Sequence, residues 1–531
     1  MKRLISSLCG IAALALATLV LPAGGQAQNT PQMERVPDRT AQEGVGPFGR
    51  MLIRGATLID GSGAPPEGPV DIVVAGNRIE AIYRGDGRAS SPTAVDHVIE
   101  AEGMYVMPGF VDVHGHNGDP SKAPNASYGY RLWLAHGVTT VRGVPIYSGP
   151  NNQSISDRAR SAANSITAPR IFAYAVMGDV WSGGDINSPA QARSWVRWAA
   201  AQGYDGVKFF NNETPPILEA ALDEARQHNM GTVAHLGQRG VAEVNAARAV
   251  SLGLSGITHF YGHFESLLRD RALVRYPNDY NYLDEQSRFS EIARLADQIV
   301  EPGSEEWEAY LDALLENDVT MSPTFNIYSA SRDVMRARTA EWHERYTLPS
   351  LWNFYQPSLT NHGSYYHDWS TADEVAWRNF YRSWMQLTND YNNRGGRVSV
   401  GSDPGYIYQT WGFAYIGELE MLQEAGFTPL EVIQAATING AREIYAPRGE
   451  EPPFGIIRPG MLADLIVVPE NPLDNFKTLY GTGHLRLNRE TNELERVGGI
   501  RWTIKDGIVY DAPALLESVA AMVEAQRAAD E

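Results

Sequence analysis

An apolar run of the chain ends in two histidines: Val106-Met107-Pro108-Gly109-Phe110-Val111-Asp112-Val113-His114-Gly115-His116. Successive side chains of a β-strand point to opposite faces, so His114 and His116 share one face, with only Gly115 between them. Neutral imidazoles paired in this way suit a divalent metal ion such as Zn²⁺. Taken alone, the pair also fits two polar residues at a strand-to-loop junction, and the rest of the chain has to decide between the two interpretations.

Short strand-like segments lie before this run and again near the end of the sequence. The first group covers residues 51–60, 70–75, 78–83 and 95–100, with a turn at Gly76-Asn77. The second group covers residues 499–505 and 507–510, around the hairpin signal Asp506-Gly507. We therefore predict a small β-sandwich built from residues 51–107 and 447–511.

Strands and helices alternate between these two groups, which predicts parallel βα units. The eight candidate strands are 105–113, 138–142, 170–177, 206–210, 231–235, 256–260, 319–325 and 397–402. We predict an α/β fold in which a (β/α)₈ TIM barrel, residues 108–446, is inserted into the β-sandwich. Long insertions are expected near 262–317 and 327–396, with helices of their own because structureless loops of that length are unusual. Residues 512–531 are predicted to form a C-terminal helical tail.

The first 27 residues have the pattern of a secretory signal peptide. Lys2 and Arg3 are followed by an almost wholly apolar run over residues 8–21 and by small residues up to Ala27. We expect residues 1–27 to be removed, residues 28–50 to form a flexible leader, and the mature protein to be periplasmic or secreted. The single cysteine, Cys9, lies within the signal, so the mature chain has neither disulfides nor cysteine chemistry.

The chain is acidic, with 44 Lys and Arg against 63 Asp and Glu and a formal net charge of −19. This charge argues against nucleic acid as a partner and, after signal cleavage, against an anionic membrane surface. We expect a small-molecule substrate, and a homo-oligomer is compatible with a sandwich edge or an apolar barrel face.

Residues of metal-ligating or basic type fall at the ends of the predicted barrel strands, where barrel enzymes carry their chemistry. His114 and His116 end the first strand, and Lys208 lies in the fourth. His235 ends the fifth strand, while the sixth contains His259 and the eighth is followed by Asp403. Because these side chains would meet at one rim, we favour a metal site over an ordinary polar junction.

These motifs resemble those of the amidohydrolase superfamily, in the secreted branch near imidazolonepropionase-like and Xaa-Pro dipeptidase-like enzymes. The similarity runs over residues 51–510 and is carried by residues 108–116, Gly137-Val138-Thr139-Thr140-Val141-Arg142, Val207-Lys208, Ala234-His235, Thr258-His259, Gly401-Ser402-Asp403 and residues 458–465.

The resemblance implies a binuclear centre for divalent metal, with two Zn²⁺ expected and one ion sufficient in principle. His114, His116 and Asp403 would hold one ion, and His235 and His259 the other. Lys208, carboxylated by CO₂, would bridge them. The resemblance also gives Asp403 the part of catalytic base. Mn²⁺, Fe²⁺ and Co²⁺ accept the same ligands, so the sequence leaves the metal open.

We therefore expect a metal-dependent hydrolase of a C–N bond, an amide or peptide in a dipeptide or N-acyl amino acid, that acts through metal-activated hydroxide. Three alternatives stay open: a cyclic amide or lactone hydrolase with a mononuclear site, a metal-dependent isomerase and a non-catalytic ligand-binding barrel. His263, Arg142, Tyr366 and His367 are weaker candidates for contact with the substrate.

Overall fold

Residues 33–50 pack against the rest of the protein in the computed structural model. The structure describes residues 33–145, 153–179, 181–210, 213–270, 273–358 and 363–530. The predicted signal peptide and residues 28–32 lie outside these ranges. Val36 is buried, Val45 forms a β-bridge with Val509, and the Arg39 Nε donates to the Asn164 carbonyl at 3.0 Å. The prediction of a flexible leader is therefore wrong for residues 33–50, because composition does not show which few side chains are buried.

One eight-stranded sheet is formed from both ends of the sequence. Its order is β18-β17-β14-β5-β1-β2-β3, with β4 beside β1. The pairs that β1 forms with β4 and β5 are parallel, and the other pairs of the sheet are antiparallel. Buried side chains from several of its strands form a hydrophobic core of their own, which includes Ile53, Val74, Val106, Leu465 and Ile504. The strands are β1 Met51–Leu58, β2 Glu67–Ala75, β3 Arg78–Arg84, β4 His97–Glu100, β5 Tyr105–Pro108, β14 Leu465–Val468, β17 Trp502–Lys505 and β18 Ile508–Asp511.

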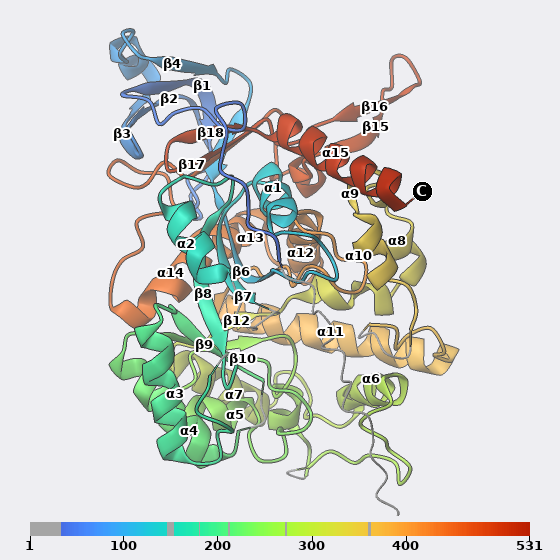
Figure 1. Cartoon of the computed structure of the whole chain (residues 1–531). Helices are drawn as coiled ribbons and strands as arrows, with labels where there is room; N and C mark the ends of the chain where they lie inside the picture. Colours follow the sequence, from blue (N-terminus) through green and yellow to red (C-terminus); the bar gives the residue numbers. More distant parts are fainter. Residues whose placement is uncertain are drawn as a thin grey trace, which may run out of the picture. The chain divides into compact units, whose positions relative to one another are not determined.

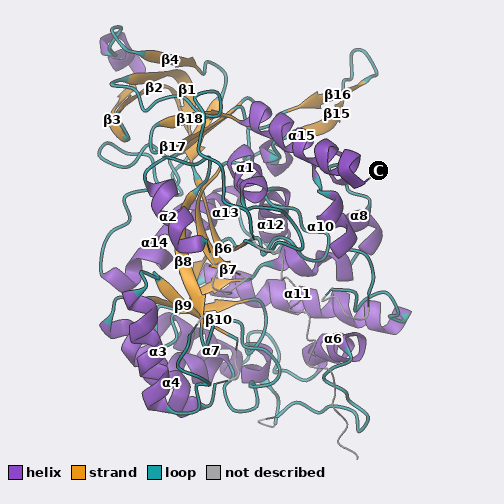
Figure 2. Ribbon diagram, in the orientation of Figure 1, coloured by secondary structure: helices purple, strands orange, loops and turns teal. Residues whose placement is uncertain are grey.

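The second sheet has eight parallel strands in sequential order from β6 to β13. Two backbone hydrogen bonds, from Val113 to the Val400 carbonyl at 3.0 Å and from Asp403 to the His114 carbonyl at 2.9 Å, join the first strand to the segment around the last. The α/β barrel prediction is thereby confirmed, and Figure 2 shows these strands in the middle of the helices. The strands are β6 Phe110–Asn117, β7 Val138–Pro145, β8 Arg170–Val176, β9 Gly206–Phe209, β10 Gly231–Ala234, β11 Gly256–Thr258, β12 Thr320–Ser322 and β13 Arg397–Val398.

Helices follow the barrel strands and cover the barrel from outside (Figure 1), and several of them are amphipathic. In α3, for example, Ala192, Trp195 and Ala199 are buried at helical spacing, and Ser188 caps the first turn by accepting from the Gln191 amide. These helices are α1 Ser127–Ala135, α2 Ser154–Ala162, α3 Pro189–Ala201, α4 Pro215–Gln227, α5 Ala246–Ser251, α7 Glu305–Glu316, α12 Phe413–Glu424, α13 Pro429–Gln434 and α14 Gly440–Tyr445. The last residues form α15 Ala512–Asp530.

Both long connections contain helices. The first contains α6 Glu285–Ala293 before α7, and the second contains α8 Val334–Arg338, α9 His343–Tyr346, α10 Pro349–Phe354 and α11 Thr371–Asn393. Aromatic residues of α11, including Trp377, Phe380 and Trp384, are buried against Phe260. The aromatic richness of this connection thus supplies hydrophobic core.

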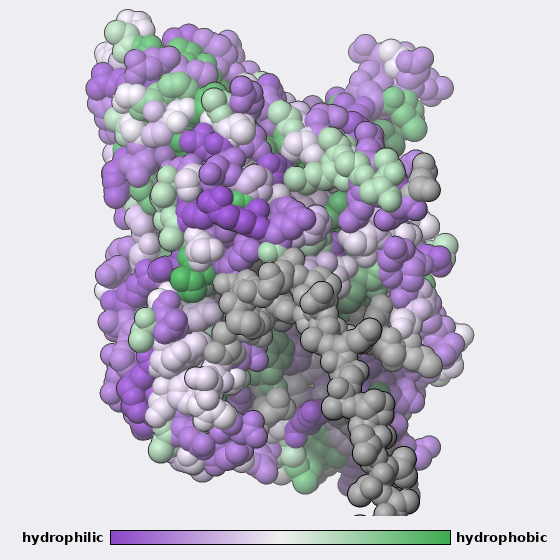
Figure 3. Space-filling view, in the orientation of Figure 1, coloured by the Kyte–Doolittle hydropathy of each residue, from purple (hydrophilic) through white to green (hydrophobic). Residues whose placement is uncertain are grey.

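A two-stranded ribbon, β15 His484–Leu487 and β16 Leu494–Val497, precedes the last strands of the first sheet. Leu485, Leu487 and Leu494 are exposed on it, whereas the described surface in the view of Figure 3 is mostly hydrophilic. Among the described residues, no helix has the length and apolar character that crossing a membrane would require.

The predicted strand over residues 105–113 is divided at Gly109 into β5, in the first sheet, and β6, in the barrel. The Gly109 amide donates to the Asp464 carbonyl at 2.8 Å, where the chain passes from one sheet to the other. A Cβ at this position would lie 2.2 Å from the Thr139 Oγ1. The division follows from this close approach to β7, which the apolar pattern of the run does not reveal.

Replacing Gly109 by alanine should therefore destabilise the junction between the sheets. We expect Gly109→Ala to lower the free energy of unfolding by about 1–3 kcal/mol, because Thr139 has to move away from the new methyl group. The measurement is the midpoint of thermal unfolding. Gly87→Ala is the matched control, since its Cβ would meet nothing within 4 Å. Equal midpoints for the two variants would contradict this account of the junction.

Candidate metal centre

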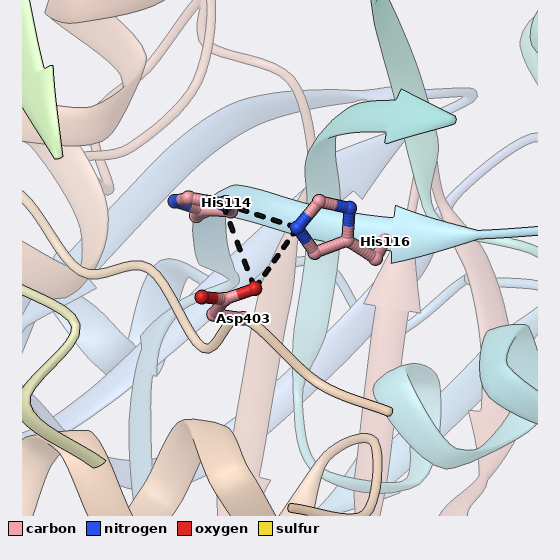
Figure 4. A group of neighbouring side chains, drawn as sticks. All are labelled: His114, His116 and Asp403. Atoms are coloured by element: carbon pink, nitrogen blue, oxygen red, sulfur yellow. Dashed lines mark hydrogen bonds and ion pairs between the residues drawn. The ribbon is translucent and has the colours of Figure 1, made fainter. Parts of the chain in front are cut away.

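Three buried side chains converge where the first and last barrel strands meet. His114 and His116 point from the same face of β6, and Asp403 reaches them from the segment after β13 (Figure 4). The His114 and His116 Nε2 atoms are 3.2 Å apart, and the Asp403 Oδ1 lies 2.9 Å from the His116 Nε2 and 3.6 Å from the His114 Nε2. Strand alternation placed the two imidazoles correctly, and the barrel brings the carboxylate to them.

This group of donor atoms fits a single metal ion. Ligands about 2.0–2.2 Å from a tetrahedral ion lie roughly 3.3–3.6 Å from one another. The three observed separations, 2.9, 3.2 and 3.6 Å, are close to that spacing, and all three residues are buried. Two imidazole nitrogens and one carboxylate oxygen form a mixed N/O ligand set suited to Zn²⁺ and to several other divalent first-row ions.

His259 and His235 extend the group along the rim of the barrel. The His259 Nε2 lies 3.7 Å from the Asp403 Oδ2, on the side of the carboxylate away from His116. The rings of His259 and His114 are 5.0 Å apart, and those of His259 and His235 are 4.8 Å apart. The two further histidines predicted at strand ends therefore lie beside the His114–His116–Asp403 group.

Lys208 lies buried on β9, next to β10, where its ammonium donates to the Thr258 Oγ1 at 3.2 Å. Burial lowers the pKa of Lys208 to about 7, against the attraction of Asp403. Burial, and secondarily the positive charge of Lys208, hold the pKa of His114 well below its usual value. Near neutral pH the His114 imidazole is thus uncharged, and a substantial share of Lys208 is the free amine.

Unusual backbone conformations aim the two predicted ligand residues that follow strands β11 and β13. His259 has φ 66° and Asp403 has φ 45°, in the left-handed region that non-glycine residues seldom occupy. Thr324, with φ 53°, brings its hydroxyl to the His259 Nδ1, so the Nε2 of that ring faces Asp403. Glu418 of α12 accepts from the amides of Phe325 and Asn326, at 2.9 and 2.7 Å, and thereby holds the turn that presents Thr324.

Asp112 connects the two ends of the barrel beneath the metal-binding group. Its Oδ1 accepts from the amides of His114, at 3.1 Å, and Ser402, at 3.0 Å, while its Oδ2 accepts from the Trp133 indole at 2.9 Å and from the Ser402 hydroxyl. Burial raises the pKa of Asp112, and these hydrogen bonds oppose that effect. Sequence analysis missed this residue, although the same alternation that pairs His114 with His116 puts Asp112 on their face.

Two of the weaker candidates for substrate contact are engaged elsewhere. Arg142 is buried and forms an ion pair with Glu443 of α14, whose other oxygen accepts from the Ser399 hydroxyl at 2.8 Å. His263 is buried with its Nδ1 against the Tyr310 hydroxyl of α7, and burial lowers its pKa to about 3. For these two residues the structure shows contacts within the protein interior instead of a place in the metal-binding group.

The other two weaker candidates lie in the second long connection. Tyr366 is buried, between the rings of Tyr365 at 5.2 Å and His367 at 4.9 Å, and burial raises its pKa. His367 is exposed. The structure does not bring either of them into the group formed by His114, His116 and Asp403.

Comparisons with known proteins agree with this architecture. No family model matches the chain. The chain is 28% identical over 176 residues to a dihydroorotase of Thermoanaerobacter sp. (strain X514). The aligned residues make up 33% of this chain and 37% of that protein. The chain is also 37% identical over 109 residues to an N-acyl-D-aspartate deacylase of Alcaligenes xylosoxydans xylosoxydans, covering 20% of this chain and 19% of the relative. The chain thus spans well under two thirds of the length of either relative.

A solved structure extends the likeness over most of the chain. The crystal structure of a Xaa-Pro dipeptidase with methionine bound in its active site matches 87% of this chain and 100% of its own, with a TM-score of 0.56 and 20% sequence identity. At that identity the match supports the fold alone.

Replacing Asp112 by asparagine should loosen the metal-binding group without removing a ligand. Asparagine keeps one acceptor oxygen, but its NH₂ group cannot accept from the donors to the other oxygen of Asp112, so at least one buried N–H or O–H loses its acceptor. We expect Asp112→Asn to lower the thermal midpoint and to weaken metal affinity by about 10–100-fold, as partners of ligands commonly do. Metal-binding titration measures the effect, with the exposed Asp86→Asn as control. Unchanged affinity would show that Asp112 does not position His114.

Proposed function

We propose that the chain is a member of the amidohydrolase superfamily, as its similarity to a dihydroorotase and an N-acyl-D-aspartate deacylase supports. In this proposal it is a secreted metal-dependent hydrolase that cleaves the C–N bond of a dipeptide or an N-acyl amino acid. The observation that carries this proposal is the buried group of His114, His116 and Asp403 at the carboxyl ends of the barrel strands, with Lys208, His235 and His259 next to it. The set combines side chains that can bind metal with the Asp403 carboxylate, which has one oxygen near His116 and the other near His259.

The proposed centre holds two divalent ions, with Zn²⁺ as the first candidate. His114, His116 and Asp403 would hold one, and His235 and His259 the other, which agrees with the 4.8 Å between the last two rings. A divalent metal, when bound, lowers the pKa of water and polarises a carbonyl oxygen.

Asp403 is the proposed general base and acid. Its Oδ1 faces His116 and its Oδ2 faces His259, so the carboxylate stands at the centre of the polar group. From there it can take a proton from the attacking water and deliver it to the nitrogen of the leaving amine. Delivery to nitrogen is what breaking an amide demands, because an amide anion is a poor leaving group.

Lys208 is proposed to react with CO₂ and to bridge the two ions as a carbamate. An ammonium has no lone pair to donate, whereas a neutral amine has one. Burial, which brings the pKa of Lys208 to about 7, makes the neutral form accessible at physiological pH. A carbamate would also replace a buried positive charge with a negative one beside the metal ions.

The proposed substrate class and location rest on other grounds. The names of two similar proteins, N-acyl-D-aspartate deacylase and Xaa-Pro dipeptidase, describe action on an N-acyl amino acid and on a dipeptide. The pattern of Lys2, Arg3, the apolar run and Ala27 supports export. We therefore propose action on small peptides or acylated amino acids outside the cytoplasm.

Asp403→Asn should abolish most of the activity while keeping much of the bound metal. An asparagine oxygen can still face a metal, but it cannot accept and release a proton. We expect kcat to fall by about 10²–10⁴-fold. The assay follows amine release from a panel of dipeptides and N-acyl amino acids by mass, and hydrolysis is distinguished from isomerisation because an isomerase would give no product of new mass. Metal content is measured in parallel, and the exposed Asp279→Asn is the control. Normal turnover by Asp403→Asn would remove the proposed role.

Lys208→Ala should reduce the metal content of the protein. Wild type prepared with bicarbonate should hold about two ions per chain and the variant about one or none, because the bridge is lost. The exposed Lys477→Ala is the control. Metal content unchanged in Lys208→Ala, at about one ion per chain, would contradict the bridge and favour a mononuclear site acting on a cyclic amide or lactone.

The same bridge predicts a pH dependence. The amine of Lys208 is neutral above its pKa of about 7 and becomes protonated as the pH falls below it. Carbamate formation from ¹³C-bicarbonate, followed by NMR while metal is added, should therefore be stronger at about pH 8 than at about pH 6. A signal that is absent at both values, or present in Lys208→Ala, would contradict the assignment.

A further inference from the structure

A cavity of about 530 Å³ lies apart from the metal-binding group. It is lined by residues of η4 Phe325–Ser331, α8, α11 and α12, helices that lie on one side of the barrel in Figure 1. Its volume is within the range of small-molecule sites. None of the predicted metal ligands lines it, although two lining residues, Asn326 and Gln409, belong to the loops that also carry Thr324 and Asp403.

Four arginines surround this cavity, in a chain whose net charge is −19. Arg332 and Arg336 come from the segment at the start of α8, and Arg378 and Arg382 lie four residues apart on one side of α11. Three acids also line it: Asp333, Glu420 and Glu424. The lining therefore carries one more positive than negative charge.

The three acids already have donors. Glu424 accepts two hydrogen bonds from Arg332, at 3.1 and 2.5 Å. Glu420 accepts from the Tyr480 hydroxyl at 2.7 Å, and Asp333 accepts from the backbone amide of Arg336 at 3.0 Å. Each acid thus has at least one donor in the cavity wall, and Glu424 is paired with Arg332 through both of its oxygens.

Donors are left over. The Arg336 guanidinium reaches the Glu420 carboxylate only at 4.0 Å, and its side chain is 77% exposed. Arg382 is exposed and bonds through one nitrogen to the Asn379 amide oxygen at 2.9 Å. Both guanidinium groups are thus accessible, with N–H groups available to an occupant that brings oxygen acceptors.

The walls add an apolar surface to these donors. Trp342 and Tyr480 are half-buried rings of the lining, and they stack with their ring centroids 5.5 Å apart. We propose that this cavity is a second binding site, for a small organic carboxylate with a planar or apolar body. The carboxylate would lie between Arg336 and Arg382, and the body would lie against the aromatic walls.

Isothermal titration calorimetry with benzoate tests this proposal on the metal-loaded protein at constant ionic strength. Benzamide, which has nearly the same shape without the charge, is the ligand control. The variant is Arg336→Gln/Arg382→Gln, and Arg489→Gln, which changes an exposed arginine of the β15–β16 turn, is its matched control. Equal thermal midpoints verify that the variants fold.

We expect wild type and Arg489→Gln to bind benzoate saturably and in preference to benzamide. The double variant should bind benzoate about tenfold more weakly, because two charge-assisted contacts are lost. Benzoate that binds the double variant as tightly as wild type, for instance through a metal ion, would overturn the proposal. So would equal binding of benzamide, or the absence of benzoate binding to wild type. Binding is measured without turnover, so these outcomes do not depend on the proposed hydrolase activity.

Discussion

The Asp112 carboxylate is the contact on which the arrangement of the centre depends. It accepts from the backbone of His114 on the first barrel strand and from the backbone and hydroxyl of Ser402 after the last one. A (β/α)₈ barrel has to close between those two strands, and a buried carboxylate stays buried at low energy only when donors surround it. Closure therefore places Asp403, the neighbour of Ser402, within reach of His114 and His116 before any metal binds.

Burial then sets the chemistry of the groups around this junction. It favours neutral His114 and brings the pKa of Lys208 to about 7, so both can act as electron-pair donors near neutral pH. His259 and Asp403 have left-handed backbone conformations, which cost free energy in non-glycine residues. They persist because the packed surroundings of both residues hold them. A metal ion held by these converging side chains would stabilise the folded protein, because the unfolded chain does not bring them together.

Sequence patterns predicted what depends on local periodicity. Alternation along one strand placed His114 and His116 on one face, and the alternation of strands and helices gave the barrel and the sheet formed from both ends. Contacts between distant segments were not predictable. Asp112 accepts from the amide of Ser402, 290 residues further along the chain, and Arg142 forms an ion pair with Glu443, although it was predicted to contact the substrate. Gly109, too, separates two sheets because of Thr139 on another strand, a neighbour that the apolar run does not contain.

The long connection between β12 and β13 supports the centre from outside the barrel. Its aromatic helix α11 packs on Phe260, the residue after His259. The Tyr381 hydroxyl of that helix donates to the Phe325 carbonyl at 2.6 Å, while Glu418 holds the Phe325 amide from the other side. The turn that presents Thr324 to His259 is thus fixed at both its carbonyl and its amide groups. The hydrophobic packing of α11 therefore keeps this turn from relaxing and holds His259 in place.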